Sequence, residues 1–153
     1  VADRPMTIFD VSRLDRDALA RFPCPAGYEV RRMGADDARQ LDAGLEPHAL
    51  QVFESAEHFA RSGMGYAVIA GDGTLACAAT AYTVSSCNLE VAIATRVGHR
   101  GLGLAALAAA ALMRASLDAG LAPQWSASNP VSKRLAERLG YRPGSECEVL
   151  LLG

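Results

Sequence analysis

The glycine-containing segment 100–105 has the residue types and spacing that most clearly indicate chemistry. Gly101 and Gly103 lack a Cβ atom, so an anion can approach the backbone closely there. The segment precedes an expected long helix, whose first amide groups lack internal partners and lie at the positive end of the helix dipole. Arg100 adds a full positive charge. This pattern predicts a main-chain cradle for a pyrophosphate; the alternative is a glycine-rich turn that only joins a strand to a helix.

The same residues also fit the dinucleotide-binding pattern G-x-G-x-x-A, over residues 101–106. That pattern requires a loop directly after the first strand, and an acidic residue about 20 positions further on. Here, several expected strands precede the loop, and residues 121–128 contain no Asp or Glu. The context therefore argues against a nicotinamide-dependent oxidoreductase.

The elements that must position this loop can be read from hydrophobic periodicity, turn residues and caps. Strands are expected at 28–33, 65–70, 75–84, 88–95, 124–126 and 146–152, and helices at 36–45, 48–61, 102–119 and 130–139. Asp72-Gly73 predicts a hairpin between two of the strands. This order predicts an α/β fold with a mixed, mostly antiparallel sheet flanked by helices.

Length and charge bound the class of protein. A chain of 153 residues suits one domain, here expected at 26–153. Residues 1–25 are interpreted as a lead-in that ends an upstream region, because the chain begins with Val. The sequence indicates a cytoplasmic protein with no membrane span, no nucleic-acid partner and no metal site. Within a chain of net charge −2, residues 96–142 hold six Arg and one Lys against two acids, which suits a small polyanionic ligand.

Three motifs in order resemble the GNAT superfamily of acyl-CoA-dependent N-acetyltransferases. The phosphate-loop pattern Q/R-x-x-G-x-G/A is matched by Arg100, Gly103 and Ala105. The segment 90–95 is similar to the strand that leads to that loop. The segment 129–141, NPVSKRLAERLGY, is similar to the later N-x-x-S/A…L-G-F/Y helix. With the preceding Pro-Gln-Trp, it resembles a bacterial branch that includes an antibiotic-resistance acetyltransferase.

The resemblance implies a GNAT-like sheet that splays at the strand before the phosphate loop, and acetyl-CoA as cofactor. The pantetheine arm would pair with the backbone around Ile93 and Thr95. The pyrophosphate would be held by the loop, specifically by Arg100, Gly101, Leu102, Gly103, Leu104 and Ala105. Asn129 and Ser132 would contact the coenzyme A arm, although each also has a local explanation as a helix cap or first-turn residue.

The implied reaction is attack of a primary amine on the thioester carbonyl, with a small molecule or a peptide as the amine acceptor. Glu90 is the candidate base, because Ala92 and Ala94 on its face of the strand leave room for a substrate; the alternative is a solvated strand carboxylate. The resemblance implies the backbone N–H of Ala94 as the oxyanion donor. Glu54, Glu57 and His58 are further candidates for acceptor contact.

One departure from the family weakens the case for catalysis. Many members place a Tyr, which protonates the leaving thiolate, four residues before the Gly of L-G-F/Y; here that residue is Ala136, and Tyr141 is expected in the core. A catalytically weak acyl-CoA-binding accessory domain is therefore the alternative function. The last strand could also pair between the subunits of a homodimer.

Overall fold

The computed structural model describes residues 3–150, including the side chains of residues 6–81 and 83–142. Its strands are β1 (Asp3–Asp10), β2 (Tyr28–Arg32), β3 (Gly65–Ala70), β4 (Leu75–Val84), β5 (Asn88–Thr95), β6 (Ala122–Gln124), β7 (Ser126–Ala127) and β8 (Arg142–Leu150). Its α-helices are α1 (Ala35–Gln40), α2 (Ala56–Ser62), α3 (Leu104–Asp118) and α4 (Pro130–Arg138). Short helical turns are η1 (Val11–Arg13), η2 (Arg16–Ala20), η4 (Val97–His99) and the π-helical η3 (Leu41–Leu45).

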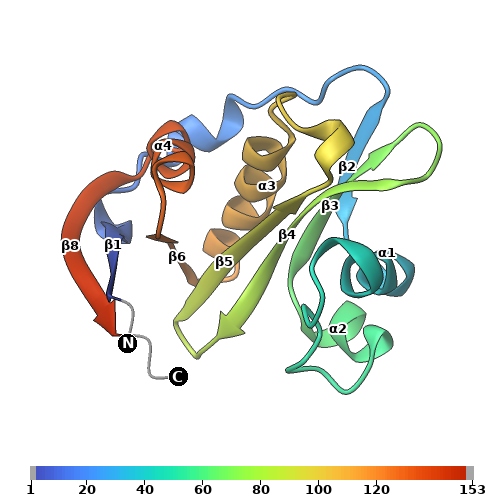
Figure 1. Cartoon of the computed structure of the whole chain (residues 1–153), viewed down its shortest axis with the longest axis horizontal. Coiled ribbons are helices and arrows are strands. Elements are labelled where there is room, and N and C mark those ends of the chain that lie inside the picture. The colour runs from blue at the N-terminus through green and yellow to red at the C-terminus, as the bar shows by residue number, and fades with distance from the viewer. Residues whose placement is uncertain (1–2, 151–153) are drawn as a thin grey trace.

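Five strands form the main sheet in the order β2-β3-β4-β5-β6 (Figure 1). The first three pairings are antiparallel, and β5 and β6 run parallel, so the predicted mixed, mostly antiparallel sheet is confirmed. The predicted hairpin joins β3 to β4. Its turn is held by the Asp72 carboxylate, which accepts a 2.9 Å hydrogen bond from the Thr74 N–H, and by Gly73 at φ +87°.

Helices cover both faces of the main sheet. The alanine-rich α3 lies on one face, where Ala108 and Leu112 pack against Val68 and Ala79. The helices α1 and α2 lie on the other, where Ala38 and Phe59 join residues of β3 and β4. Because side chains alternate along a strand, neighbouring residues such as Val68 and Ile69 contribute to opposite layers.

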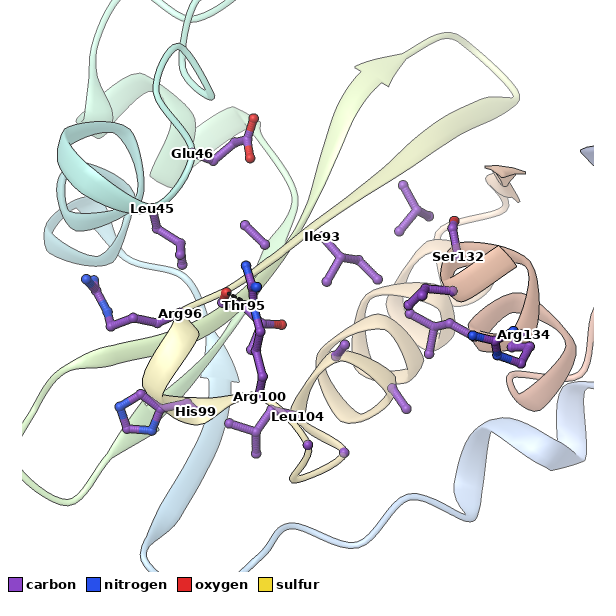
Figure 2. A pocket seen from close by; sticks show the side chains of 18 of the residues that line it. Leu45, Glu46, Ile93, Thr95, Arg96, His99, Arg100, Leu104, Ser132 and Arg134 are labelled. Carbon is purple, nitrogen blue, oxygen red and sulfur yellow. Dashed lines mark hydrogen bonds between the residues drawn. The ribbon is translucent and has the colours of Figure 1, made fainter. Parts of the chain in front are cut away.

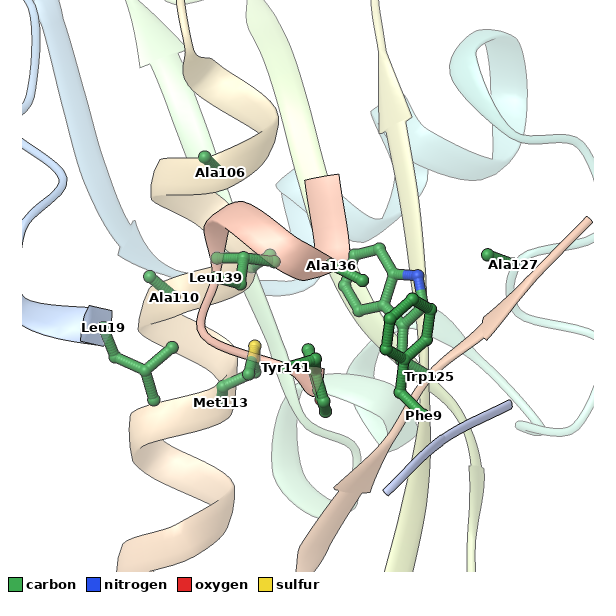
Figure 3. Packing of buried hydrophobic residues seen from close by; sticks show 11 residues of the cluster. Phe9, Leu19, Ala106, Ala110, Met113, Trp125, Ala127, Ala136, Leu139 and Tyr141 are labelled. Atoms are coloured by element: carbon green, nitrogen blue, oxygen red, sulfur yellow. The ribbon is translucent and has the colours of Figure 1, made fainter. Parts of the chain in front are cut away.

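A second sheet, in the order β7-β1-β8, stands beside the first and forms its own core with α3 and α4 (Figure 3). Phe9 of β1 and Leu19 of η2 are almost fully buried in it, with Trp125 and Tyr141. No strand was predicted within residues 1–25, because apolar and polar residues do not alternate clearly along β1. Its register is set by β8 and β7, which lie more than a hundred residues away in the sequence.

Three further boundaries differ from expectation. The helix expected at 48–61 begins only at Ala56; turns precede it, with Pro47 and with His48 at φ +70°. The helix expected from 102 begins at Leu104, after two glycines in the left-handed region. The last strand, expected at 146–152, begins at Arg142, and residues 151 and 152 lie outside the described part.

The feature that shapes the site is the short contact between β5 and β6. They pair only from Asn88 to Glu90, against Ala122 to Gln124. After Trp125 the chain continues as β7, which pairs with β1 in the second sheet. The segment thus changes sheets within six residues, and no strand within residues 3–150 pairs with that edge of β5 from Val91 to Thr95. The splay expected before the phosphate loop is therefore present.

Gly140 ties the N-terminal segment to α4 and generates a stability prediction. It has φ +101°, and a Cβ there would lie 2.6 Å from the Asp15 carbonyl oxygen. We expect Gly140→Ala to lower the free energy of unfolding by about 3 kcal/mol, because backbone strain adds to a clash with fixed backbone. Gly120→Ala, with φ +76° and open space, should cost only about 1 kcal/mol. Chemical denaturation measures both, and equal losses would contradict the proposed contact.

Candidate functional site

The divergence of β5 from β6 opens a cleft of about 1350 Å³ (Figure 2). Its walls come from β5, the loop into α3, the first turn of α3, the β6–β7 segment and α4. The end of η3 and the residue after it close one side. Ten of the twelve sequence-predicted site residues line this cleft, and Glu90 and Leu102 do not. The ten are Ile93, Ala94, Thr95, Arg100, Gly101, Gly103, Leu104, Ala105, Asn129 and Ser132.

The free edge of β5 presents backbone groups in a fixed alternation. The Arg96 N–H donates to the Ala76 carbonyl oxygen of β4 (2.8 Å), while the Cys87 carbonyl on the opposite edge accepts from the Ala122 N–H (2.8 Å). Because backbone groups alternate between the two edges of a strand, odd-numbered residues of β5 face the cleft and even-numbered ones face β4. The amides of Ile93 and Thr95 therefore point from the open edge into the cleft. The resemblance predicts pairing of the pantetheine arm with this part of the backbone.

The same alternation corrects the expectation for Ala94. Its register partner is Ala78 of β4, so its N–H belongs to the antiparallel ladder and points away from the cleft. An oxyanion donor on this strand must come from an odd-numbered residue, and Val91, Ile93 and Thr95 all line the cleft. Only the methyl group of Ala94 contributes to the wall.

The glycine loop has the geometry of an anion cradle. Gly101 and Gly103 have φ of +79° and +77°, and a Cβ at either would meet no atom within 4 Å. No side chain caps α3, so the amide groups of its first turn face the cleft without a described side-chain partner. The loop therefore fits the diphosphate of coenzyme A through its main chain. The Leu102 side chain is half exposed outside the lining.

Four arginines give the cleft its positive charge. Arg96 and Arg100 come from the loop after β5, and Arg134 and Arg138 come from α4. The Arg100 Nε donates to the Thr95 carbonyl oxygen (3.3 Å), which holds its stem at the open edge. The loop is anchored by His99, whose Nδ1 lies 2.7 Å from the Tyr28 hydroxyl. A polyanion is thus favoured at this end of the cleft.

Asn129 and Ser132 lie at the start of α4, and both line the cleft. The Asn129 Oδ1 accepts from the Ser132 N–H (2.8 Å), so its role as a helix cap is confirmed. The Ser132 Oγ accepts a 3.1 Å hydrogen bond from the indole N–H of Trp125. These bonds fix α4 against the β6–β7 segment, and contact with coenzyme A remains a proposal for both residues.

Glu90 lies at the apex of the splay, where β5 last pairs with β6. It is half-buried, and its side chain does not line the cleft. Its neighbour Tyr141 is buried, and its hydroxyl donates to the Pro123 carbonyl oxygen (2.6 Å). Burial, and secondarily the Glu90 carboxylate, raise the pKa of Tyr141. Tyr141 is therefore the core aromatic that the sequence predicted, and its proton is not available to a leaving thiolate.

Some residues considered from the sequence do not line the cleft, and others that line it were not singled out. Ala136 is fully buried beside Trp125 and Tyr141, so nothing from that position reaches the cleft (Figure 3). Glu54, Glu57 and His58 do not line it. Glu46, Arg134 and Arg138 do. The basic composition of 96–142 was the only sequence signal for the two arginines, and nothing local singled out Glu46.

Comparison with known proteins finds a matching family model and a related sequence. A family model described as GNAT acetyltransferase matches residues 2–150. The chain is 25% identical over 160 residues to the uncharacterised N-acetyltransferase YdfB of Bacillus subtilis, covering 98% of this chain and 61% of that protein. The chain thus spans about three fifths of the length of this relative.

Solved structures agree. A GCN5-related N-acetyltransferase-like protein from Streptococcus suis is similar with a TM-score of 0.85 at 26% identity, over 96% of this chain and 60% of that one. A GCN5-related N-acetyltransferase from Kribbella flavida, at 23% identity and a TM-score of 0.65, covers 95% of this chain and 56% of its own, and shows the fold alone. The predicted GNAT-like fold is confirmed. No helix in the described part is long and apolar enough to span a membrane.

The cleft wall also generates a prediction about thiol reactivity. Cys77 is buried beneath β5, with its Sγ 3.3 Å from the Thr95 Oγ, and burial raises the pKa of its thiol to about 11. Since the thiolate is the reactive form, only on the order of one in a thousand Cys77 side chains is ionised at pH 8. We expect alkylation of the native protein at pH 8 to label the exposed Cys24 and Cys87 but not Cys77.

Mass spectrometry of the digested protein measures this labelling, and the denatured chain serves as the control in which Cys77 reacts. Labelling of native Cys77 at the rate of Cys24 would contradict a closed wall beneath Thr95.

Proposed function

Because the chain belongs to the GNAT acetyltransferase family, we propose that it transfers the acetyl group of acetyl-CoA to a primary amine of a small molecule or a peptide. The observation that carries the proposal is the continuity of three features along one cleft: the open backbone edge of β5, the uncapped first turn of α3 and the arginines around it. Each suits a different part of acetyl-CoA, the acyl donor of this family.

The proposed donor site uses mostly main chain. The Ile93 carbonyl oxygen and the Thr95 N–H, both on the open edge of β5, would pair with the amides of the pantetheine arm as a neighbouring strand would. The amides from Gly101 to Ala105 would hold the diphosphate. Asn129 and Ser132 would contact the arm from the opposite wall. Because few side chains are needed, affinity depends on backbone geometry at the glycines.

In the proposed reaction a C–N bond forms between the amine and the acetyl carbonyl, and the C–S bond to coenzyme A breaks. The amine must first lose a proton, and we propose that the Glu90 carboxylate at the apex receives it, directly or through water. The Ile93 amide would donate to the oxygen that gains negative charge. The thiolate leaves and takes up a proton from solvent.

A second candidate function is an acyl-CoA-binding domain with little catalysis. It is favoured by the buried Ala136 and by the Tyr141 hydroxyl, which is engaged with Pro123. No tyrosine is among the described residues that line the cleft. A thiol with a pKa near 8.5 is a tolerable leaving group, so the missing acid would cost about 2 kcal/mol of activation free energy. Measured turnover with amines separates the two functions.

The cradle is tested by Gly103→Glu. A carboxylate there would enter the anion site, so we expect calorimetric titration to show at least a 100-fold loss of affinity for acetyl-CoA. The control is Gly120→Glu, because Gly120 has nearly the same φ and open space but lies beyond the other end of α3. It carries the same strain and charge, and it should bind within twofold of wild type. Equal losses in both folded variants would overturn the proposed site.

The base is tested by Glu90→Gln. We expect kcat to fall about 100-fold, with the affinity for acetyl-CoA unchanged, because the amide cannot accept the proton. Glu137→Gln, on the exposed face of α4 outside the cleft, is the control for charge. An unaltered kcat in Glu90→Gln would remove Glu90 from the reaction.

A further inference from the structure

The charge of the cleft is distributed unevenly between its two sides. Of the described residues that line it, four are Arg and only one, Glu46, is acidic. Figure 2 shows Leu45 and Glu46 on one side of β5, and Ser132 and Arg134 on the other. The carboxylate therefore lies away from the α4 wall, on the side that α1 and η3 cover.

The backbone of Glu46 is fixed at both of its polar groups. Its N–H donates to the Leu41 carbonyl oxygen (2.8 Å), which is the i to i+5 bond that closes the π-helical turn η3. Its carbonyl oxygen accepts from the Ala49 N–H (3.1 Å). Such π turns often occur at functional sites, because the extra residue redirects the side chains that follow. Here Leu41 stays buried in the core while Leu45 and Glu46 reach the cleft.

The Glu46 side chain is exposed, and within the described part of the chain its carboxylate makes no hydrogen bond or ion pair. Its negative charge is thus available to a ligand. The acids of the neighbouring segment differ: the Asp42 carboxylate accepts from the Leu50 N–H, and the Glu57 carboxylate pairs with Arg39.

Binding of the acyl donor would reverse the charge of the cleft. The lining side chains carry a net charge of +3, from four Arg and one Glu. Acetyl-CoA carries about −4, from its diphosphate and its 3′-phosphate. The lining side chains and the bound donor would together carry a charge of about −1. Glu46 would be the acidic side chain of the protein in that sum. A cation is repelled before the donor binds and attracted afterwards.

A carboxylate that stays ionised stabilises a charged ammonium beside it. Because Glu90 is the proposed proton acceptor for the reacting nitrogen, Glu46 is left for another part of the acceptor. It is suited instead to a second cationic group, which stays charged throughout turnover.

We propose that the acceptor is an amine with a second cationic group and that Glu46 binds this group. This inference rests on the proposed function, because it takes coenzyme A as the occupant of the basic part of the cleft. In this proposal Glu46 determines the specificity for the acceptor amine.

The test uses three acceptors with the same four-carbon chain: 1,4-diaminobutane, butylamine and 4-aminobutanoate, whose second groups are cationic, absent and anionic. With saturating acetyl-CoA, we expect wild type to have the highest kcat/KM for the diamine. Glu46→Gln should lower that value on the order of tenfold, mainly through KM, and raise that of 4-aminobutanoate. Butylamine turnover and acetyl-CoA affinity should stay within twofold.

The matched control is Glu137→Gln, which makes the same charge change on the exposed face of α4 outside the cleft and should leave the order of the three acceptors unchanged. If Glu46→Gln leaves the order intact, or if wild type does not prefer the diamine, the inference is wrong while acetyl transfer stands.

A calorimetric titration keeps the inference testable without turnover. Wild-type protein loaded with coenzyme A should bind 1,4-diaminobutane more tightly than the free protein does, and Glu46→Gln should weaken binding to the loaded protein on the order of tenfold. Failure of wild type to acetylate any amine would overturn the proposed function alone. Equal diamine binding by loaded wild type and loaded Glu46→Gln would overturn the assignment of Glu46.

Discussion

The structure depends on the change of sheet at Trp125. Its carbonyl oxygen accepts from the Phe9 N–H (3.2 Å), its indole N–H donates to Ser132, and its ring packs against Tyr141. These contacts commit the chain after β6 to the second sheet, so β6 cannot follow β5 beyond Glu90. An unpaired strand edge is normally a liability, because its backbone groups invite another strand. Here the edge is enclosed in a cleft, where an extended ligand can take the place of a strand.

The proposed acetyl-CoA site has two parts that are made of backbone groups, the open edge of β5 and the glycine loop. The strand offers hydrogen bonds in one alternation, which places the amides of Ile93 and Thr95 in the cleft and leaves that of Ala94 in the sheet. Two residues with left-handed φ then turn the chain so that α3 begins with its amides facing the same cleft. Small side chains on α3 allow the helix to lie close to the sheet, so the glycine loop keeps a fixed position relative to the open edge of β5.

The opposite wall is made by parts of the chain that are far apart in sequence. The arginines of α4 and the acid after η3 line the same cleft from opposite sides of β5, because α4 packs on the second sheet and Leu41 of η3 packs in the core of the first. Binding of a polyanion at one end therefore changes the field at the other through charge alone, without any movement of the fold. The proposed function requires the same cleft to hold an anionic donor and a cationic acceptor.

The sequence by itself determined the features that are local. The glycine loop, the Asp-Gly hairpin, the Asn-Pro start of α4 and most of the main-sheet strands depend on backbone freedom, turn chemistry and period, which are properties of neighbouring residues. Tertiary structure alone decided the strand β1, the edge to which each amide of β5 points and the side chains that share the cleft. These depend on register and packing between distant segments, as for Glu46 and Arg134, and no local pattern encodes a contact across so long a separation.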